Sequence, residues 1–371
     1  MKKIIFFMPN IERGGIEKNL VLLSKYFINK DYSIEIIFSK ISEDIKNNLD
    51  KRIKLNKSKN FIKKKFFSER INNSINSFIN LILLNTKKKS IIISMQDHPF
   101  AIAASKKLNL KCILRIANHP SNSIKFFNKF YKYKFKLFIK LFFYNFASGI
   151  ICNSKSSTSY LKSKTNNKNI INIYNPILLD KINKKFHRKN YLLTVGRLED
   201  QKNIKGIILA FKKIEKDYPK FKLVVVGSGQ EETVLKELVK VNDISHKVKF
   251  IKYKDPKRYY KESKLFILNS FWEGLPNVLI ESLNYKLPII STDCESGPKE
   301  ILLNGKYGFL TQVDSPLLLS RKISFILNNY KLAEKKSSLG FKSLKRFDIT
   351  SQCQKYERFI NKIIKWLNFQ L

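Results

Sequence analysis

The sequence predicts an α/β protein with two doubly wound, Rossmann-like domains. Short, continuously apolar runs of the kind found in buried parallel strands alternate with longer helical patterns. This alternation stops once, at a polar and basic stretch over residues 175–190, and then starts again. The chain has 371 residues, which is enough for two domains that each bury a large core.

The elements follow in order along both halves. In the first half we expect strands at 3–8, 33–38, 90–94, 111–116, 148–153 and 169–174, with helices such as 16–29 and 68–85 between them. In the second half we expect strands at 191–196, 222–227, 248–253, 264–270 and 287–292, with helices at about 203–214, 231–241, 256–262, 276–285, 315–328, 331–343 and 351–368.

These elements predict domains at residues 1–178 and 190–345, and a C-terminal helical segment at 346–371 that packs back toward the first domain. Doubly wound sheets bind ligands outside the carboxyl ends of their strands. The site is therefore expected in strand-to-helix turns of both halves, facing a central cleft.

Composition restricts the class of protein. The four cysteines form no CxxC pair, which indicates a reducing cytoplasm without disulfides. The charge-free stretch Leu141–Ser154 has 14 residues, whereas a membrane-spanning helix needs about 20 apolar ones. Lysine and arginine number 72 against 29 acids, and the net charge of +43 favours a polyanionic partner, either nucleic acid or an anionic membrane.

Three glycine-containing turns follow predicted strands. Gly14 and Gly15 precede a helix, where they permit a close approach by an anion. The loop "VGRLEDQKN" (195–203) places Arg197 and Lys202 beside a helix N-terminus, an arrangement suited to a diphosphate, although a solvated basic loop explains it too. Gly227 opens a Gly-x-Gly turn that lacks the third glycine of a dinucleotide fingerprint, so a simple tight turn explains it equally.

The stretch "SFWEGLPNVLIESL" (270–283) carries the strongest signal. Glu273 stands in a turn at a strand end, and the free amides near residues 275–278 suit phosphate or sugar oxygens. Glu281 comes four residues after Asn277, so both lie on one helix face. The alternative is a first-turn acid and a solvent-facing acid, but that leaves the apolar character of the helix unexplained.

Taken together, these motifs resemble a known family. The Gly-Gly turn, "GRLEDQKN", the Gly-x-Gly turn, "EGLPNVLIE" and "PIISTDCESGPKEIL" occur in the order seen in the retaining glycosyltransferases of family four, which have the GT-B fold. The chain is similar, within that family, to bacterial enzymes that add hexoses or N-acetylhexosamines to undecaprenyl-diphosphate-linked glycans. The resemblance spans nearly the whole chain.

The resemblance implies a role for each matching residue. Arg197 and Lys202 would hold the diphosphate of a UDP-sugar, Glu273 would bind the transferred sugar and Glu281 the ribose. The remaining residues expected near the sugar nucleotide are Gly14, Gly15, Gly196, Gly227, Gly274, Leu275, Asn277 and Val278. Pro276 has no amide hydrogen to contribute. Gly14 and Gly15 would contact either the phosphates or the acceptor.

A histidine near the anomeric carbon is also implied by the resemblance. His119, in "RIANHPSN", is the candidate, and His98, in "SMQDHPFA", competes with it. We find no Asp-x-Asp motif, and Asp293 and Glu295 do not follow a strand ending at the diphosphate. We therefore expect neither a catalytic metal nor a cofactor.

One predicted helix, at 123–146, contains lysines but no acids. Its lysines form one stripe, without an acid from Ser123 to Ser148: Lys125, Lys129, Lys132, Lys136 and Lys140. We expect this stripe to dock a cytoplasmic enzyme on the anionic inner face of the cell membrane and to contact a polyprenyl-diphosphate-linked glycan.

Three other functions remain open: a GT-B transferase with a soluble acceptor, a nucleotide-sugar epimerase, or a basic nucleic-acid-binding protein. Nucleic acid is not expected as a partner, because the sequence shows no recognition module among the lysines.

Overall fold

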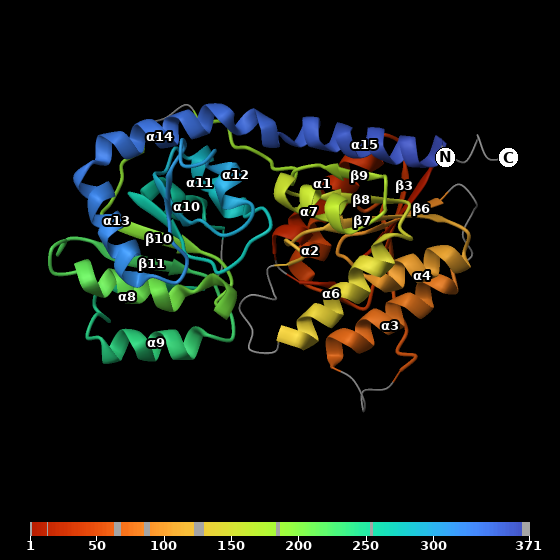
Figure 1. Cartoon of the computed structure of the whole chain (residues 1–371), viewed down its shortest axis with the longest axis horizontal. Coiled ribbons are helices and arrows are strands. Elements are labelled where there is room, and N and C mark those ends of the chain that lie inside the picture. Colours follow the sequence, from red (N-terminus) through yellow and green to blue (C-terminus); the bar gives the residue numbers. More distant parts are fainter. Residues whose placement is uncertain are drawn as a thin grey trace. The chain divides into compact units, whose positions relative to one another are not determined.

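The computed structural model describes residues 2–12, 14–62, 68–84, 90–121, 130–182, 186–252 and 255–365. It divides into two compact units. Unit 1 comprises Met1–Leu178 together with Phe347–Leu371, and unit 2 comprises Leu179–Arg346. Each unit is built on a parallel sheet with helices on both faces (Figure 1), which confirms the predicted doubly wound α/β class.

Unit 1 has a seven-stranded sheet in the order β5-β3-β1-β6-β7-β8-β9. Its strands are β1 (Lys3–Phe7), β3 (Ser33–Phe38), β5 (Lys54–Lys57), β6 (Ser90–Ser94), β7 (Lys111–Ile116), β8 (Gly149–Cys152) and β9 (Ile170–Asn172). A small separate sheet pairs β2 (Asn10–Ile11) with β4 (Lys40–Ile41). The helices are α1 (Gly15–Ile28), α2 (Glu43–Asn48), α3 (Glu69–Ile82), α4 (Pro99–Lys107), α6 (Phe130–Tyr144), α7 (Lys155–Lys164) and α15 (Ile349–Lys365).

Both faces of this sheet are buried. Side chains of β1 alternate between two cores: Ile4 and Phe6 pack with α1 and α15, whereas Ile5 and Phe7 pack with α4, α6 and α7. Such burial on both sides explains why the strand sequences are continuously apolar.

Unit 2 has a six-stranded sheet in the order β12-β11-β10-β13-β14-β15. Its strands are β10 (Tyr191–Val195), β11 (Lys222–Val226), β12 (Val248–Ile251), β13 (Leu265–Leu268), β14 (Ile289–Thr292) and β15 (Phe309–Thr311). The helices are α8 (Ile204–Ile214), α9 (Glu232–Val241), α10 (Lys257–Glu262), α11 (Asn277–Asn284), α12 (Pro298–Ile301), α13 (Pro316–Asn328) and α14 (Tyr330–Lys342), with short 3₁₀ turns at η1 (Asp200–Lys202) and η2 (Ser343–Phe347). Figure 1 shows α8 and α9 on one side of the sheet and α10, α11 and α12 on the other.

The strand orders fix where each unit can bind a ligand. In unit 2 the chain runs outward from β10 through β11 and β12, then crosses to β13 on the other side of β10. In unit 1 it runs outward from β1 through β3 and β5, then crosses to β6. Ligands of doubly wound sheets bind at this reversal point, outside the carboxyl ends of the two strands. The turns after β10 and β13, and those after β1 and β6, are therefore the places to examine.

Candidate active site

The turn after β10 is shaped by close contact with the turn after β11. A Cβ atom on Gly227 would stand 1.9 Å from the carbonyl oxygen of Gly196, so both predicted glycines serve this contact. The Leu198 amide donates to the Ser228 carbonyl at 3.0 Å and ties the two turns together. The β10 turn ends at Asn203, which has a φ of 45° and whose Oδ1 accepts from the Gly206 amide at the start of α8. The loop that carries Arg197 and Lys202 is thus held in one conformation by its backbone.

The turn after β13 meets that loop through an ion pair. Lys202 Nζ lies 2.5 Å from Glu273 Oε1, and the two side chains are only 16% and 7% exposed. Ser270 Oγ donates to the same carboxylate oxygen at 2.7 Å. Two residues predicted separately, 71 positions apart in the sequence, are therefore joined at the reversal point of the sheet.

The turn after β14 holds the turn that contains Glu273 by contacts with its backbone. Ser296 Oγ donates to the carbonyls of Glu273 and Gly274, at 2.6 and 3.1 Å. Gly297 has a φ of +58°, and a Cβ there would stand 2.1 Å from the Gly274 carbonyl oxygen. Ser296 and Gly297 were not predicted as site residues, although both lie in the stretch "PIISTDCESGPKEIL".

The helix that follows, α11, carries Glu281 on a half-buried face. Its Oε2 accepts a hydrogen bond from the Tyr260 hydroxyl at 2.9 Å. The Tyr260 ring stacks on Tyr285, with 5.7 Å between ring centroids. Asn277 and Val278 begin the helix and are half-buried, whereas the Leu275 side chain is buried in the turn before it. Tyr260 comes from α10 and had no signal in the sequence that linked it to Glu281.

Arg197 is more accessible than its neighbour Lys202. Its side chain is 52% exposed, and Nη1 lies 2.8 Å from Glu199 Oε1. An exposed pair of this kind contributes about 0–1 kcal/mol. A bound diphosphate can therefore compete for the guanidinium at little energetic cost.

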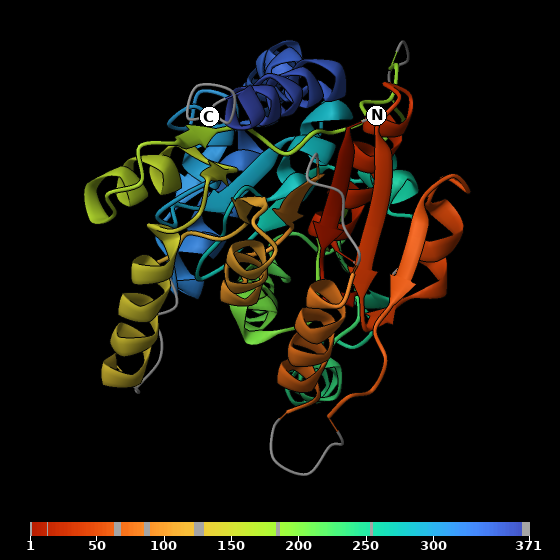
Figure 2. The same cartoon turned by 90° about the vertical axis from the view of Figure 1, so that its right-hand side faces the viewer.

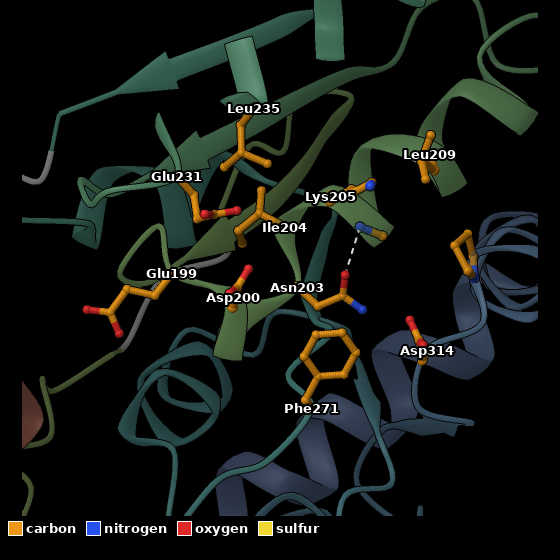
Figure 3. Close-up of a pocket in the computed structure, with 12 residues that line it drawn as sticks. Glu199, Asp200, Asn203, Ile204, Lys205, Leu209, Glu231, Leu235, Phe271 and Asp314 are labelled. Atoms are coloured by element: carbon orange, nitrogen blue, oxygen red, sulfur yellow. Dashed lines mark hydrogen bonds between the residues drawn. The ribbon is translucent and has the colours of Figure 1, made fainter. Parts of the chain in front are cut away.

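A hollow of about 270 Å³ lies beside the start of α8. Glu199, Asp200, Glu231 and Asp314 line it together with Phe271 (Figure 3). None of the residues predicted to bind the sugar nucleotide lines this hollow. Its four carboxylates would repel phosphate, so the hollow is not the diphosphate site.

In unit 1, the Gly14–Gly15 turn begins α1. A Cβ on Gly14 would stand 2.6 Å from Glu17 Oε2, so the carboxylate of Glu17 lies against this turn. Glu17 is buried, and an acid in a first helical turn interacts favourably with the helix dipole. A phosphate that binds to these amides would have to share the helix N-terminus with Glu17.

The two candidate histidines follow neighbouring strands. His119, after β7, is buried, with Nδ1 2.9 Å from Ser121 Oγ and its ring 5.1 Å from that of Tyr160. His98, after β6, precedes α4 and packs edge-on against Phe7. Burial lowers the pKa of His98 to about 4, so its ring is neutral at neutral pH. Of the two, His98 lies at the reversal point of the sheet.

The predicted lysine stripe is only partly described. Lys125, Lys129 and the side chain of Lys132 lie outside the described residues. Lys136 is exposed on α6, but Lys140 Nζ lies 2.5 Å from Asp97 Oδ2. In the part of the chain that the structure describes, no helix has both the length and the apolar character that crossing a membrane requires.

The turn after β14 also contains acidic side chains. Asp293 pairs with Lys299 at 3.0 Å. Within the described ranges, no three His, Cys, Asp or Glu side chains are grouped as metal ligands would be.

The second half of the chain is similar in sequence to known glycosyltransferases. Residues 178–342 match the family described as "Glycosyl transferases group 1". An uncharacterised glycosyltransferase of Methanocaldococcus jannaschii is 34% identical over 234 residues, which span 55% of this chain and 56% of that protein. A Campylobacter jejuni enzyme, named GalNAc-alpha-(1->4)-GalNAc-alpha-(1->3)-diNAcBac-PP-undecaprenol alpha-1,4-N-acetyl-D-galactosaminyltransferase, is 25% identical over 98% of this chain and 99% of its own.

The fold has close structural counterparts as well. Anabaena HepE in complex with UDP-glucose superimposes with a TM-score of 0.81 and 17% identity, over 98% of this chain and 100% of that chain. The motifs in unit 2, the two doubly wound units and the match over residues 178–342 agree. Residues 178–342 are therefore similar to the group 1 glycosyltransferases, and the chain has the GT-B fold.

Proposed function

We propose that this glycosyltransferase moves a hexose or N-acetylhexosamine from a UDP-sugar to an undecaprenyl-diphosphate-linked glycan, with retention of configuration and without a metal ion. The observation that carries the proposal is the Lys202–Glu273 pair at the reversal point of the unit 2 sheet. The C. jejuni relative, whose name states an undecaprenol-linked acceptor, supports the choice of acceptor.

The departing UDP gains negative charge as the bond to the sugar breaks. Lys202 is held in place by Glu273 and the fixed β10 turn, so its cation needs no reorganisation to stabilise that charge. The exposed Arg197 can leave Glu199 and bind the diphosphate through its planar fork of donors. These two cations take the place of a metal in the proposed mechanism.

The two glutamates orient the sugar nucleotide. In the proposal, Glu273 accepts hydrogen bonds from hydroxyls of the transferred sugar while it remains paired with Lys202. Glu281, fixed by Tyr260, accepts from the ribose hydroxyls. The amides of Leu275, Asn277 and Val278 face oxygens of the donor at the start of α11, where the helix favours anions.

The site of action that we propose is the inner face of the cell membrane, with the protein bound peripherally. The net charge of +43 supports an anionic surface and a diphosphate-containing acceptor. A soluble acceptor and epimerisation of the sugar nucleotide are the alternative reactions, and both predict that a lipid-linked acceptor is unnecessary.

A product assay tests the proposal. The purified chain is incubated in EDTA with a panel of UDP-sugars and with either a polyprenyl-diphosphate-linked glycan or the same glycan without lipid. We expect one UDP-hexose or UDP-N-acetylhexosamine to be consumed, with an α-linked sugar added to the lipid-linked acceptor. Transfer to the lipid-free glycan alone, epimerised UDP-sugar, or a requirement for magnesium or manganese would contradict the proposal.

A further inference from the structure

Helix α6 exposes an apolar face instead of a polar one. Its exposed fractions are 66% for Phe135, 68% for Phe138, 37% for Ile139 and 54% for Phe142, and Phe146, just after the helix, is 45% exposed. Positions separated by three, four and seven residues share one side of a helix. The rings of Phe142 and Phe146 lie 5.2 Å apart, so the row continues past the end of α6. We call these five residues the aromatic row.

The opposite side of α6 packs into unit 1. Tyr144 is fully buried, and Leu141 and Phe143 pack against the core that contains α4. Figure 2 shows α6 (yellow) at one edge of unit 1. Burial therefore accounts for one apolar face of this helix, and the aromatic row forms a second one that faces solvent. Contiguous exposed apolar surface of this kind marks an interaction site.

Charge identifies the partner as anionic. From His98 to Leu179 the sequence contains 14 lysines and arginines and not one aspartate or glutamate. Lys134 and Lys136, both exposed, precede and follow Phe135 on the helix. A second copy of this chain would bring a further charge of +43 to the same face, which disfavours a dimer through the aromatic row. An anionic lipid surface satisfies both the apolar row and the cations.

The same helix is fastened to the turn after β6. Asp97 Oδ2 accepts from Lys140 Nζ at 2.5 Å and from the Tyr144 hydroxyl at 2.7 Å. Asp97 precedes His98 at the reversal point of the unit 1 sheet. Asp97 therefore links α6, which carries the aromatic row, to the turn where unit 1 is expected to bind its ligand.

We infer that α6 seats the protein on an anionic bilayer by inserting the aromatic row at the boundary between headgroups and acyl chains, with Lys134 and Lys136 against lipid phosphates. The Lys140–Asp97 pair then serves to orient the helix and does not bind lipid. The inference rests on the proposed function, because a lipid-linked acceptor is the reason for the protein to bind a membrane. Vesicle binding needs neither sugar donor nor acceptor, so either proposal can fail without the other.

The test is binding of the full chain to vesicles of phosphatidylcholine with phosphatidylglycerol, measured by sedimentation. Burial of a phenylalanine side chain in an apolar environment is favourable in free energy. The double substitution Phe138→Ser with Phe142→Ser should therefore lower the partition coefficient by at least about tenfold. Val234→Ser with Val241→Ser, on α9, is the matched control, because these side chains are 59% and 77% exposed. That pair should change binding by less than about twofold, and equal binding by both variants and the wild type would overturn the inference.

A second measurement separates insertion from adsorption by lysines alone. Phe138→Trp should give blue-shifted emission that brominated lipids quench, after subtraction of the signal from the two native tryptophans. Vesicle binding without quenching would overturn the inference. So would failure of the wild type to bind anionic vesicles, or an oligomer in solution that the Phe138→Ser, Phe142→Ser variant converts to a monomer.

Discussion

Arg197 and Glu281 differ from the Lys202–Glu273 pair because neither is needed to hold the turns together. Arg197 pairs with the half-buried Glu199, and Glu281 accepts from a tyrosine that is itself fixed by stacking. Their removal should therefore affect the reaction more than the fold. We expect Arg197→Ala and Glu281→Gln each to lower transfer by at least about tenfold, which corresponds to ~1.4 kcal/mol of transition-state stabilisation.

Steady-state transfer rates and urea unfolding test this expectation together. Arg321→Ala, which removes an exposed arginine from α13, is the matched control for Arg197→Ala and should retain full activity. Near wild-type turnover in both Arg197→Ala and Glu281→Gln would show that neither residue acts in the transfer reaction.

His98 gives a prediction about pH. Its pKa in the folded protein, about 4, is below the ordinary value of 6.5 because the ring is buried. Folding thus favours the neutral ring, and this contribution is complete above pH 6.5 and is lost as the pH falls toward 4. The loss amounts to at most about 3 kcal/mol.

Urea unfolding at pH 7 and pH 4.5 checks the sign. The wild type should lose more stability between the two pH values than His98→Asn, and His246→Asn, which removes an exposed histidine, should behave like the wild type. An equal loss in His98→Asn would show that other groups cause the pH dependence.

The sequence could predict the residues whose role depends on their own motif. Lys202, Glu273 and Glu281 stay predictions that rest on their own motifs, and the structure brings Lys202 and Glu273 into contact. Tyr260 and Ser296 were missed because their roles depend on tertiary contacts made from α10 and from the turn after β14. The pairing of Lys202 with Glu273 was missed for the same reason.

At the level of secondary-structure elements, the turns after β10 and β11 contact each other and together position the loop that contains Lys202. Gly227 allows backbone contact with Gly196, and an alanine there would place Cβ 1.9 Å from a carbonyl oxygen. A backbone atom cannot move aside as a flexible side chain can, so Gly227→Ala must separate the two turns. We expect it to destabilise the protein by about 2 kcal/mol and to lower transfer, because the loop with Lys202 shifts.

Ser228→Ala provides the control, since Ser228 lies next to Gly227 in the same turn and its side chain is exposed. It should match the wild type in both unfolding and transfer. A Gly227→Ala variant with wild-type stability and rate would show that the contact between the turns does not position the loop.

Most elements were predictable because both sheets are buried on two faces and their strands are apolar throughout. Strand β5, with the sequence KLNK, was missed because it lies at the sheet edge and has no apolar run. Strand β15 has only three residues. The spacing of the lysines in the predicted helix at 123–146 can be read from the sequence. The ion pair of Lys140 with Asp97 cannot, because it depends on a contact between the helix and a distant turn.

At the scale of the whole molecule, the chain returns to unit 1 through α15. Tyr356, Phe359, Ile360 and Ile363 of this helix belong to the unit 1 core. The Tyr356 hydroxyl accepts from Arg115 Nε at 3.1 Å, and Arg115 is itself buried beneath it. Phe359→Ala should destabilise unit 1 by about 3–5 kcal/mol, whereas Lys355→Ala, at an exposed position of the same helix, should have little effect.

Unfolding curves of both variants test the role of α15. A Phe359→Ala protein as stable as the wild type would mean that α15 is not part of the unit 1 core. Within the polar and basic stretch over residues 175–190, Arg188 contacts unit 2. Arg188 donates to the backbone carbonyls of Tyr260, Ser263, Tyr285 and Lys286, and so fixes this stretch to unit 2.

We propose that the turns after β10 and β13 of unit 2 bind the diphosphate of a UDP-sugar through Lys202 and Arg197, without a metal. Calorimetric titration of the full chain with UDP in EDTA tests it most directly. We predict binding by the wild type, and at least about tenfold weaker binding by Lys202→Met and by Arg197→Ala. Absence of UDP binding until magnesium or manganese is added, or equal affinity in all three proteins, would contradict the claim.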